Sequence, residues 1–360
     1  MSKLEGLIQK FCPNGAEHAP LESVCQISKG IQFNKSAMND SGTYPVINGG
    51  ITASGYIEQY NQEENTITIS QGGASAGYVN WIETKFWAGA HCYVLKPSDK
   101  VLNRYLFHFV KSKEQKLQEC QYGAGIPALA KSTVASLQIP LPPLAVQREI
   151  VRILDSFTEL TAELTAELTA RRKQYEHYRD ELLTFGDNVP KATLGEICDF
   201  KYGKGNNIPS EAGEYPVYGC NGIVSTTNVF NSEDAPIIGH IGSAGIVNWG
   251  AGKHYVTYNG TICKANPEKV LSKYVYHLLC SLHLERFVKG SQPFLSYGDF
   301  SKEIVSVPTL AEQQRVITLL DHFDTICNDL VSGLPAEIEA RQKQYEYYRD
   351  KLLTFKELAV

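Results

Sequence analysis

The residues closest to a catalytic motif are Glu83-Thr84-Lys85, which match the E-x-K half of a nuclease metal site, with Asp99 nearby. In such a site, carboxylates hold a divalent cation that activates the attacking water. The later part of the chain repeats this region, and Ala251-Gly252-Lys253 occupies the corresponding place. Because the acidic residue is not duplicated, the sequence predicts that this segment is not a nuclease site.

Other enzyme classes lack their sequence signatures. Asn266-Pro267-Glu268 does not match the Asn/Asp-Pro-Pro-aromatic motif of amino-methyltransferases. Gly203-Lys204-Gly205 and Gly72-Gly73 are not followed by the Gly-Lys-Ser/Thr of a P-loop. The nine His show no metal-ligand spacing, and the nine Cys include no C-x-x-C pair. We therefore expect a non-catalytic protein with no cofactor of its own, whose thiols stay free in the cytoplasm.

The acidic residues of the chain are concentrated in two segments. The net charge is −5, yet residues 20–140 carry ten basic and nine acidic residues, and residues 191–308 carry ten of each. Segments 145–189 and 309–360 each carry six basic and nine acidic residues. The two nearly neutral segments could hold local basic patches. Binding to DNA by this chain alone should be weak, because phosphate neutralisation supplies most of the sequence-independent affinity.

The chain is a tandem repeat, which is the first feature to seek in a sequence of this length. Residues 171–185 and 341–355 are identical at twelve of fifteen positions. Other blocks recur in the same order, including Val79-Asn80-Trp81 and Val247-Asn248-Trp249. The chain therefore consists of two copies of one unit of about 170 residues. The repeat is also cyclic, because Leu7–Phe11 resembles the end of a long helix and likewise precedes a globular part.

The two copies diverge between the matching blocks. Gly30–Asn39 has no clear counterpart in Lys204–Ser210, and Cys120–Ala130 differs from Arg286–Ser296. A duplicated scaffold with divergent loops indicates two similar modules that recognise two different targets.

Each copy contains a long helix with a coiled-coil seam. Large or apolar residues recur at alternating steps of four and three. In the first copy these are Ile150, Leu154, Phe157, Thr161, Leu164, Leu168, Arg171, Tyr175, Tyr178, Leu182 and Phe185. The second copy has a stutter at Gly333 and Pro335, where we expect a break or kink. We expect the two helices to pair antiparallel; the alternative is that each packs only on its own globular domain.

The segments outside the helices have the pattern of compact β-rich domains. Short strands are predicted at Tyr44–Ile47, Thr66–Ser70, Tyr78–Ile82, Cys92–Leu95, Pro236–Gly239, Ile246–Trp249 and Thr261–Lys264. Amphipathic helices are predicted at Leu102–Cys120 and Leu271–Val288. The expected class is α+β, with two tandem β-rich domains separated by a pair of long antiparallel coiled-coil helices in a pseudo-two-fold repeat.

In this order, the features resemble the specificity subunits of type I restriction–modification systems. The residues that carry the resemblance are Ile139–Ile150, Arg171–Phe185, Gly290-Ser291-Gln292-Pro293 and Gly333–Ile338 with Arg341–Phe355. The resemblance covers nearly the whole chain, although the first copy has Gly123–Pro127 in place of Lys289–Pro293, and its helix lacks the Gly-Leu-Pro break.

The resemblance implies two target-recognition domains that each read one half of a bipartite double-stranded DNA site. It places them at residues 1–143 and 188–309, with conserved helices at 144–187 and 310–360. The helices would act as a ruler between the half-sites and dock methyltransferase subunits that carry S-adenosylmethionine. Restriction (translocase) subunits would then join the complex. Two copies of Thr-Ala-Glu-Leu, at Thr161–Leu164 and Thr165–Leu168, would help to set the length of the ruler.

Under this resemblance, DNA contacts should come from the polar side chains of Gly-rich loops, with Lys on phosphates and Gln or Asn on base edges. Each residue could equally lie in an ordinary solvated turn. The candidates are Lys29, Gln32, Asn34, Lys35, Gln71, Lys85, Tyr122, Lys201, Lys204, Asn206, Asn207, His240, Lys253, Lys289 and Gln292.

Helix residues at matched positions have simpler interpretations. Ion pairing within the helix is favoured over DNA contact for Arg171, Lys173, Arg341 and Lys343. Seam packing is favoured over base stacking for Tyr175, Tyr178, Tyr345 and Tyr348. The competing functions are a protein-interaction scaffold with duplicated binding domains and a self-contained nuclease or methyltransferase.

Overall fold

The computed structural model describes residues 3–33, 36, 38–39, 41–123, 125, 127–205, 212–328 and 333–358. The chain divides into two compact units. Unit 1 comprises Met1–Glu163 and Ile338–Val360, and unit 2 comprises Leu164–Glu337. Because unit 1 joins the two ends of the chain, this division matches the cyclic repeat expected from the sequence.

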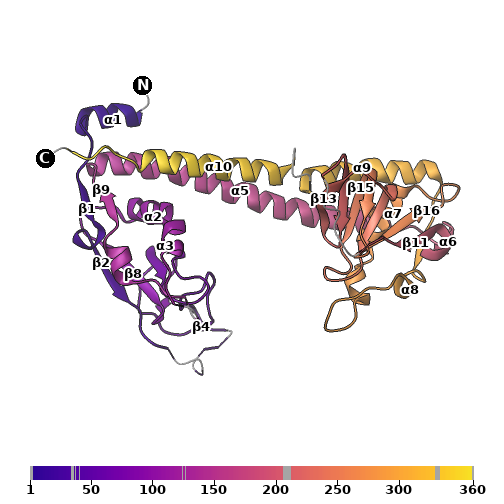
Figure 1. Ribbon diagram of the computed structural model, residues 1–360, viewed down its shortest axis with the longest axis horizontal. Coiled ribbons are helices and arrows are strands. Elements are labelled where there is room, and N and C mark those ends of the chain that lie inside the picture. Colours follow the sequence, from indigo (N-terminus) through magenta and orange to yellow (C-terminus); the bar gives the residue numbers. More distant parts are fainter. Residues whose placement is uncertain are drawn as a thin grey trace. The chain divides into compact units, whose positions relative to one another are not determined.

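The long helical segments of the two copies form three helices. Helix α5 (Leu144–Leu182) is a single helix of 39 residues that begins in unit 1 and ends in unit 2 (Figure 1). The second helical segment is divided into α9 (Leu310–Asn328) and α10 (Leu334–Leu352). This confirms the break expected near Gly333, with Pro335 in the first turn of α10, where its missing N–H removes no helical hydrogen bond.

The expected helix pairing is present inside each unit. In unit 1, the ring of Phe157 on α5 stacks on Tyr348 of α10, with 5.4 Å between ring centroids. In unit 2, Tyr178 of α5 stacks on Phe323 of α9 at 5.5 Å, and Arg172 donates to the carbonyl of Cys327. From Tyr178 back to Arg172 along α5, the partner on α9 moves forward from Phe323 to Cys327, so these two helices run antiparallel.

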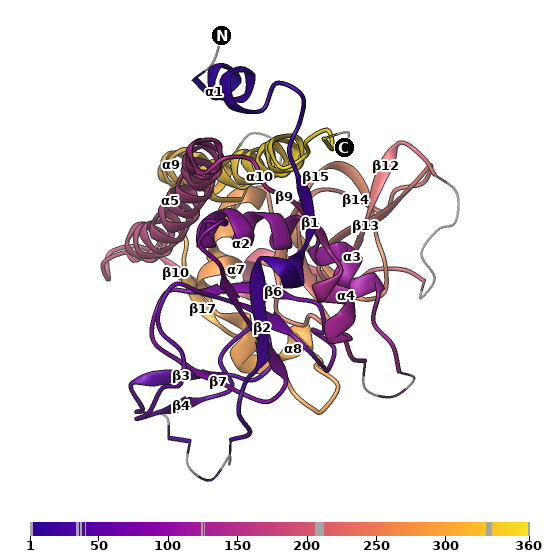
Figure 2. The ribbon, with the colours of Figure 1, turned by 90° about the vertical axis from the view of Figure 1, so that its left-hand side faces the viewer.

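Unit 1 is built on an antiparallel sheet in the order β2-β8-β5-β6. Its strands are β2 (Cys25–Lys29), β5 (Thr66–Ser70), β6 (Val79–Ile82) and β8 (Cys92–Pro97). Helix α2 (Asn103–Ser112) contributes Tyr105, Leu106 and Phe109 to the buried core. Smaller sheets are formed by β4-β3-β7 (Tyr56–Ile57, Tyr44–Ile47, Trp87–Ala88) and by β1 (His18–Pro20) with β9 (Gln138–Pro140), as Figure 2 shows.

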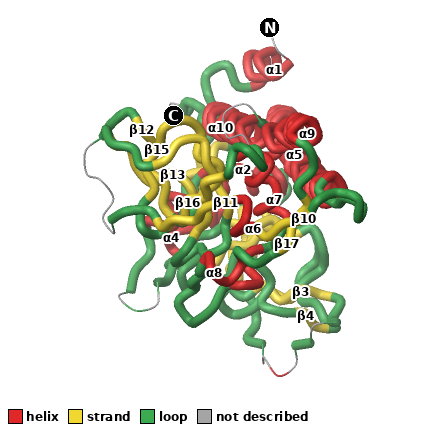
Figure 3. Tube along the Cα trace, turned by 90° about the vertical axis from the view of Figure 1, so that its right-hand side faces the viewer, coloured by secondary structure: helices red, strands yellow, loops and turns green. Residues whose placement is uncertain are grey.

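Unit 2 repeats this plan, but its two larger sheets are merged into one. The order is β11-β16-β14-β15-β12-β13, with β12 and β15 parallel. Figure 3 shows β11, β12, β13, β15 and β16 of this sheet as yellow tube. The strands are β11 (Cys198–Tyr202), β12 (Tyr215–Gly219), β13 (Gly222–Thr227), β14 (Ser232–Gly239), β15 (Val247–Val256) and β16 (Gly260–Ala265). Helix α7 (Ser272–Ser281) corresponds to α2, and β10 (Lys191–Thr193) pairs with β17 (Ile304–Ser306) as β1 pairs with β9.

The helices expected at Leu102–Cys120 and Leu271–Val288 are each interrupted, so those boundaries were wrong. In unit 1, α2 is followed by a separate α3 (Glu114–Glu119), and in unit 2, α7 is followed by the 3₁₀ turn η3 (Leu284–Phe287). The cause is a close approach to a glycine with positive φ. A Cβ on Gly77 would lie 2.7 Å from the backbone nitrogen of Gln118, and one on Gly245 would lie 3.0 Å from that of Glu285. A straight helix would not bring these turns against the glycine loops.

Candidate nucleic-acid interfaces

Each unit attaches its globular part to the helices through one buried glutamine. Gln147 accepts a hydrogen bond from the amide of Leu102 at 2.9 Å, and donates to the carbonyls of Lys100 and Pro142 at 3.0 and 2.8 Å. Gln313 makes the same three bonds, with the amide of Leu271 and with the carbonyls of Lys269 and Pro308. Both side chains are fully buried, so each glutamine holds the start of α2 or α7 against its helix.

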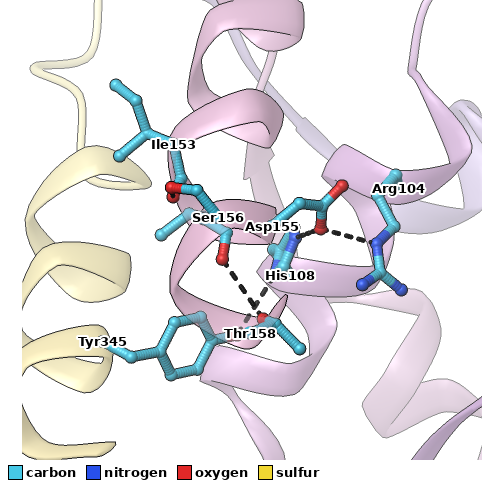
Figure 4. Close-up of polar contacts among 8 residues, drawn as sticks. Arg104, His108, Ile153, Asp155, Ser156, Thr158 and Tyr345 are labelled. Carbon is cyan, nitrogen blue, oxygen red and sulfur yellow. Dashed lines mark hydrogen bonds and ion pairs between the residues drawn. The ribbon is translucent and has the colours of Figure 1, made fainter. Parts of the chain in front are cut away.

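A second matched network joins the globular part to the helices in each unit, and Figure 4 shows that of unit 1. In unit 1, Nε2 of the buried His108 donates to Asp155 at 2.8 Å, Arg104 donates to the same carboxylate at 2.7 Å, and the hydroxyl of Tyr345 lies 3.1 Å from Nδ1. Burial lowers the pKa of His108, which keeps the imidazole neutral and leaves Nδ1 to accept from Tyr345. Burial would raise the pKa of Asp155, but the hydrogen bonds from His108 and Arg104 lower it.

Unit 2 contains the same network with residues from different parts of the chain. His277 lies 2.8 Å from Asp321 and 3.3 Å from the hydroxyl of Tyr175, and Lys273 takes the place of Arg104. Tyr175 belongs to the end of α5, whereas its counterpart Tyr345 belongs to α10. The two histidines are fully buried, whereas the aspartates are partly exposed. Tyr345 and Tyr175 contact these histidines of α2 and α7, and seam packing between the long helices is confirmed for Tyr348 and Tyr178 by their stacking on Phe157 and Phe323.

In each unit, a strand end and two loops form a surface that we call the platform. In unit 1 it consists of the end of β2, the loop that starts at Gln71 and the hairpin closed by Tyr122 and Ala128; in unit 2 it consists of the end of β11, the loop that starts at His240 and the hairpin closed by Lys289 and Phe294. Gly30 follows β2, and its amide donates to Cys92; Gly203 follows β11, and its amide donates to Gly260. A Cβ would lie 2.2 Å from a carbonyl oxygen at Gly30 and 2.1 Å from one at Gly203. Only glycine fits such a close approach of two backbones. Gly30 and Gly203 are therefore structural counterparts, and they mark where the two divergent segments that follow β2 and β11 begin.

The first loop of each platform carries a candidate residue at the same backbone position. The amide of Gln71 donates to His91 and its carbonyl accepts from Leu129. His240 makes the same pair of backbone bonds, with Asn259 and Leu295. Gln71 and His240 are therefore structural counterparts, which the sequence alignment did not reveal.

The second loop is a hairpin that is supported by the first. In unit 1, Tyr122 and Ala128 exchange two backbone hydrogen bonds, and the amide of Gly73 donates to Pro127. In unit 2, Lys289 and Phe294 exchange the same two bonds, and Gly242 donates to Pro293. The hairpin of unit 1 encloses one residue more than that of unit 2, so Tyr122 rather than Gly123 is the counterpart of Lys289.

The described candidates of unit 1 lie at or near the surface. Lys29 and Gln32 are exposed, Tyr122 is 57% exposed, and Gln71 is half-buried. The ammonium of Lys85 lies 3.2 Å from Glu63 and 4.5 Å from the ring centroid of Tyr60. The hydrogen bonds that Lys85 donates to Tyr60 and Glu63 raise the pKa of Lys85. Asn34 and Lys35 lie outside the described residues.

In unit 2, the surface position expected for His240 is wrong, whereas five other candidates are exposed. His240 is only 1% exposed, because the rings of Tyr202 and Phe294 cover it at centroid distances of 4.1 and 4.7 Å. Its Nδ1 lies 2.7 Å from the carbonyl of Leu295, so this nitrogen donates, and the imidazole packs under the hairpin. The exposed candidates are Lys201, Lys204, Lys253, Lys289 and Gln292. Asn206 and Asn207 lie outside the described residues.

Two of these lysines make contacts within the unit. The ammonium of Lys253 lies 4.8 Å from the ring centroid of Phe230, as that of Lys85 does over Tyr60 in unit 1. Lys289 is paired with Asp299 at 2.6 Å. Exposed ion pairs of this kind contribute little to stability, so Lys289 can exchange its partner at low cost.

The ion pairing predicted within the helices is confirmed for Arg171 and Lys343. Arg171 lies 3.5 Å from Glu167, and Lys343 is paired with Glu339. Arg341 donates to Gln344 at 3.2 Å, and Lys173 is exposed.

Comparison with known proteins agrees with this duplicated plan. The profile of the type I restriction modification DNA specificity domain matches twice, at residues 13–171 and 187–340. The chain belongs to the family of type I restriction–modification specificity subunits. It therefore has two target-recognition domains, and each unit contains one of them.

Curated relatives extend over almost the whole chain. A putative type I restriction enzyme specificity subunit of Haemophilus influenzae is 32% identical over 374 residues, which cover 94% of this chain and 95% of the relative. The EcoR124I/EcoR124II specificity subunit of Escherichia coli is 31% identical over 406 residues, covering 99% and 97%. The solved specificity subunit of M. genitalium has the same fold, with a TM-score of 0.67 at 22% identity, covering 94% of this chain and 96% of that one.

Four aromatic residues of the second target-recognition domain were missed by sequence reasoning. Tyr202, Tyr258 and Phe294 contact the ring of His240. The ring of Tyr202 also lies 5.0 Å from that of Tyr297 and 6.0 Å from that of Tyr258. The available signal was the high number of Tyr, 20 in the chain. Their spacing carries no pattern because they come from a strand end, a turn, a hairpin and a helix start.

Within the described part of the chain, no helix is long and apolar enough to cross a membrane. The same residues include no group of three or more His, Cys, Asp or Glu arranged to hold a metal ion.

Proposed function

We propose that each target-recognition domain reads one half of a bipartite DNA site through its platform. The observation that carries this proposal is that both platforms have the same backbone frame but different side chains. Gly30 and Gly203 fix the same strand ends, while Gln71 and His240, or Ala128 and Phe294, occupy matched positions. A constant frame with variable side chains suits two readers of different sequences on the same duplex.

The exposed polar residues of the platforms have the chemistry that this reading requires. Lys29, Lys201 and Lys204 lie at or just beyond the ends of β2 and β11 and are exposed, so they can meet phosphates. Gln32 and Gln292 are exposed amides that can bond base edges in the major groove. Phosphate contacts would set the register of each domain, and the amides would contribute to the choice of base.

We propose that methyltransferase subunits dock on the helices and supply the remaining affinity for DNA. A groove of about 1090 Å³ between α5 and α9 in unit 2 is lined by Tyr178, Leu182, Leu319 and Phe323 among others. Leu319 is 41% exposed, and Tyr178 is 37% exposed. Exposed apolar surface of this kind is typical of a protein interface. The partner would carry S-adenosylmethionine, and restriction subunits would join the same assembly.

The test is co-expression with a methyltransferase subunit from the same genome, followed by mapping of methylated adenines in genomic DNA. The expected result is a motif with two defined halves and a fixed gap. If a stable complex forms but neither methylates nor binds DNA in a salt-dependent way, the protein-interaction scaffold becomes the better interpretation. Methylation or cleavage by this chain alone would contradict the non-catalytic role.

The length of α5 should set the gap between the half-sites. Deletion of Thr165–Leu168 removes one of the two identical tetrads and shortens the helix by ~6 Å. Four residues are ~1.1 helical turns, so the seam keeps nearly the same direction. The expected result is a gap shortened by at most about two base pairs, because base pairs rise 3.4 Å each. A change of half-site bases at an unchanged gap would contradict this role.

A further inference from the structure

We infer that the second target-recognition domain reads the C5-methyl group of a thymine with the exposed rings of Phe294 and Tyr258. These rings belong to the aromatic cradle, which we define as Tyr202, His240, Tyr258, Phe294 and Tyr297. The inference rests on the proposed function, and it names a base and two residues that the proposed function leaves open.

The cradle presents apolar surface on a rigid base. Phe294 is 40% exposed and Tyr258 is 39% exposed, although both rings pack on the buried His240 at 4.7 and 5.6 Å. The backbone of Phe294 is held on both sides, by two bonds to Lys289 and by a bridge to Ile241. Ordering these rings on contact with a ligand therefore costs little entropy, which is the advantage of a preorganised binding surface.

The rings lie within a polar platform. Lys201, Lys204 and Gln292 are exposed on the strand end and hairpin that carry the cradle. An exposed apolar cluster that served only for packing would have no need of a polar rim, whereas a surface that docks on a duplex needs both. Lysines would fix the DNA backbone, and the rings would meet whatever apolar group the base edges offer.

Thymine is the base that this surface fits. In an intact duplex the base faces are stacked, so only their edges are accessible in the grooves. The C5-methyl group of thymine is the apolar group on the major-groove edge, and contact with a Phe side chain is one of its recognised readouts. A polar edge, such as that of a G·C pair, would lose its water against Phe294 without gaining a hydrogen bond.

The first target-recognition domain lacks this apolar surface at the matched positions. The backbone bonds place Lys29 at the position of Tyr202, Gln71 at that of His240 and Ala128 at that of Phe294. By the same bonds Ala90 corresponds to Tyr258 and Lys131 to Tyr297. The frame does not require aromatic rings, so the cradle belongs to what the second domain recognises. We expect the first domain to read its half-site by polar contacts at this place.

The experiment uses the full chain in complex with its methyltransferase and duplexes that carry the mapped bipartite site. Each thymine is first replaced by 5-iodouracil, whose iodine occupies the position of the methyl group, and the complex is irradiated. The expected result is a cross-link from one half-site to a peptide that contains Phe294 or Tyr258. This step needs no variant and also identifies which half the second domain reads.

The second step removes the methyl group alone by replacing that thymine with uracil. The dissociation constant should rise about fourfold, since burial of one methylene-sized group is worth about 0.8 kcal/mol. In Phe294→Ala the same replacement should change the dissociation constant by less than about 1.5-fold, which is the test of coupling in a double-mutant cycle. Tyr56→Ala, which removes an exposed ring on β4 of the first domain outside its platform, is the control and should keep the fourfold effect.

The outcomes separate this inference from the proposed function. A bipartite motif whose second-domain half has no thymine, or whose thymines can all become uracil without effect, would overturn the inference and leave the proposed function intact. Cross-linking to the methyltransferase alone would also overturn it. Failure of the complex to bind any DNA would instead overturn the proposed function.

Discussion

Replacement of Gln147 by leucine should destabilise unit 1 while leaving unit 2 almost unchanged. The fully buried amide of Gln147 makes three hydrogen bonds, to the amide of Leu102 and to the carbonyls of Lys100 and Pro142. Leucine has a similar volume, so the main loss is these bonds. At roughly 1 kcal/mol each, with an added penalty for backbone groups left without partners, the cost is about 3–5 kcal/mol.

Thermal unfolding should show this cost directly. For a unit of this size, 1 kcal/mol corresponds to a shift of about 2–4 °C in melting temperature, so Gln147→Leu should lower the transition of unit 1 by at least ~6 °C. Hydrogen exchange followed by mass spectrometry should show lost protection in α2 and β8 but not in α7 or β16. Gln313→Leu is the matched control, with the opposite distribution.

Two results would refute this reasoning. A fall of less than about 2 °C would mean that water replaces the amide, so that the bonds do not hold the unit together. Equal loss of protection in both units would mean that the units do not unfold separately. Either result would remove the basis for treating the two glutamines as independent anchors of the two recognition domains.

Three further changes test other parts of the scaffold. The hydrogen bonds from Arg152 and Lys3 lower the pKa of Glu149 to about 2. The ionised carboxylate of Glu149 therefore stabilises the folded state above its ordinary pKa of 4.5, and this stabilisation is lost as the pH falls towards 2. Glu149→Gln should weaken the decline in the free energy of unfolding over this pH range, as measured by denaturant titration. Gly77→Ala places a Cβ in a strained, crowded position and should cost about 1–3 kcal/mol in urea unfolding, whereas Gly6→Ala, in an open helical position, should be neutral or stabilising. Tyr345→Phe removes the hydroxyl that bonds His108 and should cost about 1 kcal/mol, with faster hydrogen exchange confined to unit 1.

The helical part of the molecule could be predicted from the sequence because its pattern is long and repeated. A seam that alternates steps of four and three over many turns has few structural alternatives, and Gly333 with Pro335 marks the break between α9 and α10. Strands β3 and β5 were predicted with their observed bounds, because Gly- and Asn-rich turns flank them. These signals are local, so no knowledge of the tertiary structure was needed.

The platforms could not be predicted, because their geometry depends on contacts between distant segments. His240 follows a strand and precedes a Gly-rich turn, which is typical of an exposed loop residue, yet Tyr202 and Phe294 cover it. The equivalence of Gln71 and His240 rests on backbone bonds to segments about 20 and 55 residues away, and the side chains themselves share no similarity. Sequence comparison aligns residue types, whereas these two segments share only their backbone hydrogen bonds, so the comparison could not match them.

The closure of unit 1 by the two ends of the chain explains how one duplicated sequence can give two complete domains. In unit 2, Tyr175 of α5 bonds His277, and the chain then continues from α5 into β10. In unit 1, the matching tyrosine comes from α10, and residues after it run beside the start of the chain, where the amide of Ala16 donates to Lys356 and that of Leu358 donates to Ala16. A simple tandem repeat would leave the first domain without its second helix and the last helix without a domain. Backbone pairing of the two termini supplies the first domain with α10, so each recognition domain packs on a pair of helices: α5 with α10 in unit 1, and α5 with α9 in unit 2. The two domains can then share one frame and differ in the side chains of their platforms.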